Sequence, residues 1–132
     1  MVIKLILITI VFALSWSVID YRLIKKSVKI PHSLWAVIRG LIMFYYTYVI
    51  SINHIGHMPP ILLINVFSVF YIFFELSLNK LRGLDWYYIG STSDIDKFIR
   101  YKLKLKGDTL FGVKLLIFYL SFMIYDIFYG GN

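Results

Sequence analysis

The sequence contains no cysteine among its 132 residues. Disulfide bridges, thiolate nucleophiles, cysteine-ligated zinc and iron–sulfur clusters are therefore excluded. Acidic residues are also scarce, since seven Asp and Glu stand against 14 Lys and Arg and leave a net charge of +7. The three histidines form no HExxH pattern, and no Ser–His–Asp order can be assembled around them. We expect no metal and no cofactor, and these absences favour a protein that is not an enzyme.

Apolar residues, in contrast, make up 60% of the chain, and the mean hydropathy is +0.77. A soluble domain of this length cannot bury so many large apolar side chains. Four runs approach the ~20 residues that a helix needs to cross a bilayer. They cover residues 2–19, 34–52, 60–78 and 110–128. The sequence predicts an all-α fold, in which four transmembrane helices form a single membrane domain over residues 1–132.

The first apolar run has some features of a secretory signal peptide. Lys4 precedes the apolar stretch, and Ala13-Leu14-Ser15 is a weak cleavage pattern. Cleavage would place the basic segment 22–29 outside the cell, and the bulky Trp16 would follow the cut. We therefore expect the first helix to remain part of the protein.

Basic residues gather in two of the three loops. The first loop holds four and the third loop, residues 79–109, holds seven, which together make 11 of the 14. The second loop, residues 53–59, holds none. Because cytoplasmic loops of membrane proteins are rich in Lys and Arg, loops one and three are predicted to be cytoplasmic and both termini non-cytoplasmic. Such a rim attracts anionic lipid headgroups, so its charge needs no nucleic acid to explain it.

The third loop is also predicted to contain a short amphipathic helix, residues 94–106, on the inner leaflet. Ser93 and Asp96 have the spacing of a capping box. The apolar residues that follow fall on one helical face: Ile95, Phe98, Ile99 and Leu103. Residues 101–106 alternate between apolar and basic, a pattern that also suits an extended segment.

Polar residues within the apolar runs follow a spatial order. In the third run and just beyond it they fall on one helical stripe, which should face protein: Asn65, Ser68, Glu75, Asn79 and Arg82. One charged residue per helix is predicted at a common depth near the inner leaflet: Asp20, Arg39, Glu75 and Lys114.

We expect Arg39 to pair with Glu75 in this charge layer, because an unpaired charge at such depth costs several kcal/mol. Lys114 stands near a helix end and is expected to extend toward the interface. One interpretation of the layer is that it fixes the register of the helices. The other is a polar cavity that opens to the cytoplasm beneath the third loop.

The segment Gly90-Ser-Thr-Ser precedes the predicted amphipathic helix and offers hydroxyl and backbone N–H groups to a phosphate oxygen. Ser91 and Thr92 are the candidate ligands, Arg82 would add a bidentate contact, and Asp85 is a candidate base. The segment lacks the Lys and the second Gly of a phosphate-binding P-loop. A structural interpretation remains open, in which Trp86 and its neighbouring tyrosines anchor the loop at headgroup depth.

Two histidines, His54 and His57, lie three residues apart in the second loop, where Asp126 is the one acidic residue expected nearby. A shared metal is one interpretation of this pair. The ligand set for a metal is incomplete, however, and we expect these histidines to be interfacial.

Three functions stay open. The favoured one is a non-enzymatic membrane module that binds anionic lipid, or a protein partner, through the basic third loop, including Arg82, Lys97 and Arg100. The chain could also be a homo-oligomer that forms a pore, as a holin or small channel does, with its polar stripes lining water.

The remaining alternative is an enzyme that acts on a phosphorylated lipid or isoprenoid at the inner leaflet. In that function Arg39 and Arg82 hold phosphate, and Glu75 or Asp85 is the acid–base group. The pattern ExxxNxxRG at residues 75–83, followed by YIGSTS at 88–93, resembles small membrane proteins of bacteria and phages. That resemblance implies a bacterial plasma membrane and no particular activity.

Overall fold

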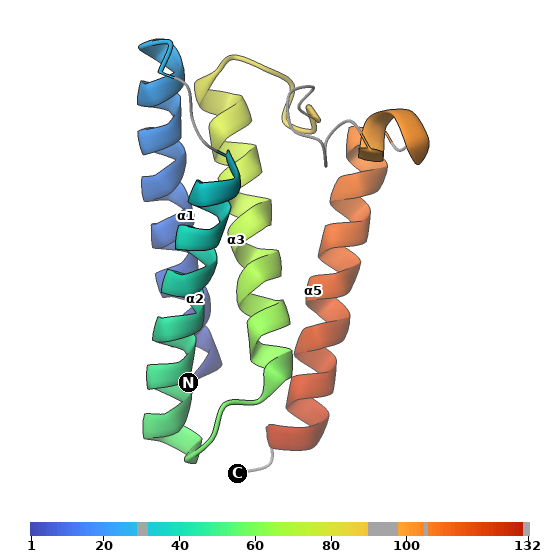
Figure 1. The fold of residues 1–132 in the computed structure, drawn as a ribbon. Coiled ribbons are helices and arrows are strands. Elements are labelled where there is room, and N and C mark those ends of the chain that lie inside the picture. The colour runs from blue at the N-terminus through green and yellow to red at the C-terminus, as the bar shows by residue number, and fades with distance from the viewer. Residues whose placement is uncertain (29–31, 90–97, 105, 131–132) are drawn as a thin grey trace.

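Four long helices dominate the computed structural model, which describes residues 1–28, 32–89, 98–104 and 106–130. They are α1 (Val2–Lys25), α2 (His32–Ile55), α3 (Pro60–Leu81) and α5 (Gly107–Tyr129). The helices alternate in direction, so the start of α1 and the end of α5 lie at the same end of the molecule (Figure 1). The predicted all-α arrangement of four helices is confirmed, and each helix is long and apolar enough to cross a membrane.

Each helix is longer than the apolar run that predicted it. The first continues to Lys25 instead of ending at residue 19, and the third continues to Leu81 instead of residue 78. Hydropathy detects only the part of a helix that is apolar enough for lipid. Residues 20–25 are more polar, but none of them interrupts helical backbone, so α1 continues through them. Arg22 and Lys25 also suit the last turn of α1, because cations are favourable at the negative end of the helix dipole.

Left-handed residues end α1 and α3 on the same side of the bundle. After α3, Gly83 has φ +69°, its N–H donates to the Lys80 carbonyl, and the Leu84 N–H donates to the Asn79 carbonyl at 3.0 Å. This is the Schellman arrangement, which turns the chain sharply away from the helix. Ser27 takes the same position after α1 with φ +56°, although it lacks the freedom of glycine.

The central helix of the bundle is α3, which contacts α1, α2 and α5. Among the long helices, α5 packs against α3 alone. The buried apolar cluster draws mainly on α1 and α3, with one residue each from α2 and α5: Leu5, Ala13, Met43, Leu62, Val66, Phe70, Phe74 and Tyr125. The core therefore lies around α3, and most of the surface of α5 faces outward.

Small side chains on α1 let the neighbouring helices approach closely. Thr9, Ala13 and Ser17 recur every four residues and are fully buried. Small residues at this spacing are typical of helix contacts in membranes, where hydroxyl groups also bond across the interface. Thr9 Oγ1 lies 2.8 Å from Tyr46 Oη on α2, and Ser17 Oγ lies 2.7 Å from Ser77 Oγ on α3. These contacts connect α1 to both partners.

The predicted polar stripe of α3 is only partly turned toward protein. Asn65 and Asn79 are buried, and Ser68 is half-buried. Glu75, however, keeps 44% of its side chain exposed, and Arg82 is exposed beyond the helix end. The reason is that α3 has neighbours on three sides only, so part of the stripe remains open.

The predicted amphipathic helix at 94–106 lies partly outside the described residues. Within them, Phe98–Lys102 forms the π-helix η1, in which the Leu103 N–H donates to the Phe98 carbonyl. Lys104 then has φ +52°, and α5 begins at Gly107. An α-helix that continues to residue 106 is therefore wrong, because a left-handed residue interrupts the helical backbone.

Candidate functional site

Exposed basic side chains crowd one end of the bundle. At this end α1 and α3 end and α5 begins (Figure 1). Among the described residues there are eight: Arg22, Lys25, Lys26, Lys80, Arg82, Lys102, Lys104 and Lys106. Asp85 and Asp108 are the exposed carboxylates described there, so eight positive less two negative charges leave +6. Toward the opposite end, the described part of the chain has one exposed Lys, Lys4, and no Arg.

Large apolar side chains are interspersed with this positive charge. Trp86, Phe98, Tyr101 and Leu103 are each about half exposed or more. The Lys80 ammonium lies 5.1 Å from the centroid of the Trp86 ring, within the range of a cation–π contact. Aromatic rings with a polar edge prefer the level of lipid headgroups, where one part of the ring is apolar and another is wet.

The segment from Leu84 to Ile89 is fastened to the end of α3 by one side chain. The buried Asn79 amide donates two hydrogen bonds, to the carbonyls of Trp86 and Tyr88, each at 3.0 Å. Both amide hydrogens of Asn79 therefore bind the main chain of the segment. The Schellman turn at Gly83 sets the direction in which the segment leaves α3. This attachment fixes Trp86 beside the basic side chains.

The same segment also meets the start of α5. The Tyr87 ring lies 5.1 Å from the Phe111 ring, and the Tyr87 carbonyl closely approaches Gly107. A Cβ atom added at Gly107 would stand 1.6 Å from that carbonyl oxygen, so only glycine fits. The ends of α3 and α5 are thereby joined.

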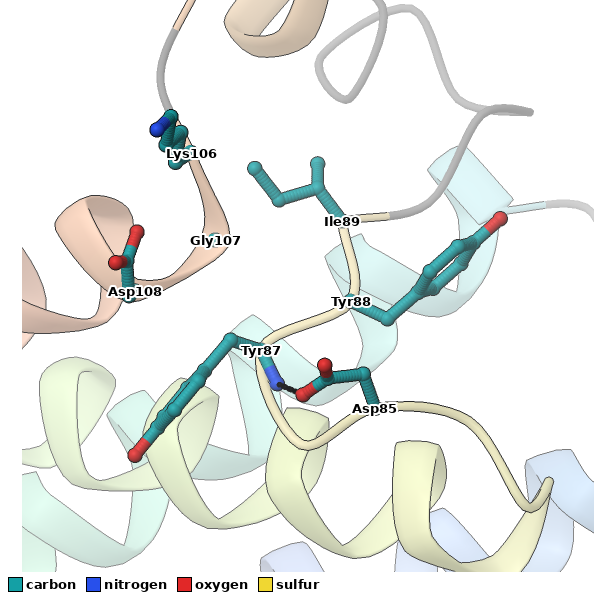
Figure 2. Close-up of a pocket in the computed structure, with 7 residues that line it drawn as sticks. All are labelled: Asp85, Tyr87, Tyr88, Ile89, Lys106, Gly107 and Asp108. Carbon is teal, nitrogen blue, oxygen red and sulfur yellow. Dashed lines mark hydrogen bonds between the residues drawn. The ribbon is translucent and has the colours of Figure 1, made fainter.

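A pocket of about 520 Å³ lies between this segment and the start of α5. Lys106 and Asp108 stand on the α5 side, and Asp85 stands on the other (Figure 2). Asp85 Oδ1 accepts the Tyr87 N–H at 3.2 Å, and Asp108 Oδ1 accepts the Thr109 N–H at 2.7 Å. Each carboxylate thus supports a local turn of the backbone, and the base role predicted for Asp85 stays a prediction.

Comparison with protein-family models, curated proteins and solved structures finds no match. The function must therefore be inferred from the physical features of the chain itself.

Two ion pairs join neighbouring long helices among the described residues, and neither is the Arg39–Glu75 pair that the sequence predicted. Arg39 Nη2 donates to Asp20 Oδ2 at 2.5 Å, which links α2 to α1. The two side chains are only 11% and 6% exposed. The expected pair is wrong because both α1 and α3 border α2, and the side of α2 that carries Arg39 brings the guanidinium to Asp20.

Aromatic rings surround the Arg39 guanidinium. Its carbon lies 4.6 Å from the centroid of the Phe74 ring and 5.2 Å from that of Trp16. Trp16 also meets Trp35 edge to face. Ring faces attract a cation, so they offset part of the desolvation of the buried charge. Arg39 is thereby enclosed, and its predicted phosphate contact gains no support from this arrangement.

The second ion pair joins Glu75 of α3 to Lys114 of α5 through a hydrogen bond from Nζ to Oε2. Lys114 is 18% exposed, so it turns toward α3 and does not extend to the interface as expected. Because α5 packs against α3 alone among the long helices, this pair helps to position α5.

Several of the remaining candidate residues fall outside the described part of the chain. These are Ser91, Thr92 and Lys97, together with the predicted helix cap at Ser93. Arg100 belongs to η1, and its side chain also falls outside the description. No hydrogen bond or ion pair joins the two acid–base candidates, Glu75 and Asp85, which are both among the described residues.

Two features of this end of the molecule are not predicted from the sequence. The first is the double hydrogen bond of Asn79, a residue that the sequence places only on a polar stripe of the third helix. Its position four residues before Gly83 was a usable signal, because a Schellman turn folds the following chain back over that part of the helix. The second is the enclosure of Arg39 by aromatic rings. The sequence shows only that Trp16 and Asp20 are one helical turn apart, and it does not show that Arg39 meets them.

Proposed function

We propose that this protein is a multi-pass membrane module whose basic end binds anionic lipid headgroups at the cytoplasmic leaflet of a bacterial plasma membrane. The observation that carries the proposal is the collection of eight exposed Lys and Arg at one end of four membrane-length helices. Half-exposed aromatic side chains stand among them, as an interfacial position requires.

The physical basis is electrostatic. A Lys or Arg near an anionic membrane surface contributes about 1 kcal/mol of attraction, and the field decays within a Debye length of ~8 Å. Several such residues at one level therefore enrich anionic over neutral lipids around the helices. The segment 84–89, held by Asn79 and by its approach to Gly107, keeps Trp86 beside the Lys80 ammonium at the end of α3.

Orientation is part of the proposal: the basic end is cytoplasmic and both termini are non-cytoplasmic. The absence of native cysteine allows a clean labelling experiment with single-cysteine variants. A membrane-impermeant maleimide applied to intact cells should label His57→Cys in the second loop, whereas Lys104→Cys should react only after permeabilisation. The reverse pattern would contradict the orientation.

Lipid selectivity is tested by native mass spectrometry of protein released from nanodiscs that contain equal amounts of phosphatidylglycerol and phosphatidylcholine. Wild-type protein should retain the anionic lipid preferentially. Changing Lys102, Lys104 and Lys106 to Gln should reduce this preference, by up to about fivefold for each removed charge. Lys4→Gln, near the opposite end, is the matched control and should behave as wild type. Equal loss in the control, or no loss in the triple variant, would sink the proposal.

The charged residues that an enzyme would use give less support to the enzymatic function that the sequence left open. Arg39 is enclosed with Asp20 between aromatic rings, and Glu75 is paired with Lys114. Asp85 meanwhile accepts a backbone hydrogen bond within its own turn. We therefore base the proposed function on the exposed end of the bundle.

A further inference from the structure

Three polar atoms of the cluster between α1 and α2 are fully buried and have no hydrogen-bond partner within the described chain. They are Trp16 Nε1, Asp20 Oδ1 and Arg39 Nε. Buried polar groups are satisfied in the great majority of cases, by protein or by ordered water. Arg39 contacts both of the other residues, so a single partner that serves all three atoms is the simplest explanation.

The three residues form one compact group. Trp16 and Asp20 lie one helical turn apart on the same side of α1. Arg39 reaches both of them from α2, since it donates to Asp20 Oδ2 and places its guanidinium carbon 5.2 Å from the centroid of the Trp16 ring. The Arg39–Asp20 contact uses one nitrogen and one oxygen, so Nε and Oδ1 remain beside an existing bond without forming a second one.

The chemistry of these atoms restricts what can satisfy them. The indole Nε1 and the guanidinium Nε are both N–H donors, whereas the ionised carboxylate oxygen only accepts. A halide could accept from both donors but offers nothing to Asp20. A metal ion or an ammonium group could satisfy Asp20 but cannot accept from an N–H. A single partner must accept two hydrogen bonds and donate at least one.

We propose that an internal water molecule occupies this cluster and bonds to Trp16 Nε1, Asp20 Oδ1 and Arg39 Nε. Buried water typically makes about three hydrogen bonds to groups that lack another partner, which is the number available. The aromatic rings of Phe74 and Trp16 lie against the guanidinium beside the three atoms, which are themselves fully buried. The water completes the polar connection between α1 and α2 at the depth of the ion pair.

The test is nuclear magnetic resonance of the full chain in nanodiscs, with 15N-labelled tryptophan and arginine. Nuclear Overhauser contacts to water are recorded in both the laboratory and the rotating frame, which separates dipolar contact from proton exchange. Trp16→Phe, which keeps a ring but removes the N–H, assigns the Trp16 indole signal. The half-exposed Trp86 serves as the control for short-lived surface hydration.

The expected result is a dipolar contact to long-lived water at both the Trp16 indole proton and the Arg39 Hε proton. Arg39→Lys, which keeps the charge but removes Nε, should abolish the contact at Trp16. Absence of the contact at either proton in the wild type, or its persistence in Arg39→Lys, would overturn the shared site. Arg39→Lys must retain the wild-type amide spectrum away from the cluster; if it unfolds, the wild-type contacts at the two protons decide alone.

Discussion

Removing one member of the Asp20–Arg39 ion pair should destabilise the bundle more than removing both members. The side chains are only 6% and 11% exposed, so solvent screens a surviving partner poorly. Loss of one partner from a buried pair costs about 3–5 kcal/mol, whereas replacing both by apolar residues is often neutral or even stabilising. The double variant Asp20→Leu with Arg39→Met should therefore approach the stability of the wild type.

The two single variants should also differ from each other. In Asp20→Leu the guanidinium keeps the rings of Trp16 and Phe74, and each such contact contributes about 0.5–2 kcal/mol. In Arg39→Met the buried carboxylate loses its cation, and the ring contacts are lost as well. Arg39→Met should therefore be the more destabilised of the two.

The assay is equilibrium unfolding in mixed micelles, in which the free energy of unfolding is measured by far-UV circular dichroism. The Glu75–Lys114 pair provides the matched control, because Glu75 is 44% exposed and its removal as Glu75→Gln should cost about 1 kcal/mol or less. If the effects of the two single variants at Asp20 and Arg39 simply add in the double variant, the reasoning about a buried, coupled pair is refuted.

Three smaller predictions concern the end of the bundle that carries the basic residues. Asn79→Leu removes two hydrogen bonds of about 1 kcal/mol each, so amide exchange in residues 84–89 should accelerate roughly tenfold or more; unchanged exchange would contradict the anchoring role. Ser27→Gly should raise the free energy of unfolding by about 1 kcal/mol, because φ is +56°, and a fall in stability would argue against that backbone. Gly107→Ala should displace residues 84–89, since its Cβ would meet the Tyr87 carbonyl, whereas Gly112→Ala meets nothing within 4 Å and should leave their exchange unchanged.

The sequence predicted those features that depend on one helix at a time. Long apolar runs are sufficient to predict four helices, because a run near 20 residues has few other stable arrangements. The apolar runs do not predict the last turn of each helix, such as the turn of α3 that ends at Leu81. Polar residues beyond the apolar run continue a helix equally well. The common depth predicted for Arg39 and the other charged residues in the helices stays a prediction.

The features that depend on how helices turn toward one another were not predictable. Arg39 could meet Asp20 or Glu75, and the choice follows from which side of α2 faces α1 and α3. The same holds for Lys114, whose contact with Glu75 exists because α5 packs on α3 alone. At the basic end, the approach of Tyr87 to Gly107 joins segments that are 20 residues apart, so no local pattern predicts it.

The measurement that tests the central claim most directly is the lipid composition of particles cut from the host membrane by an amphipathic polymer. The phospholipids that surround the purified protein are compared with those of the bulk membrane, for the wild type and for the variant with Lys102, Lys104 and Lys106 changed to Gln. Binding through the basic end predicts enrichment of anionic phospholipid in the wild-type particles and a composition closer to bulk in the variant. Wild-type particles with the bulk composition would contradict it.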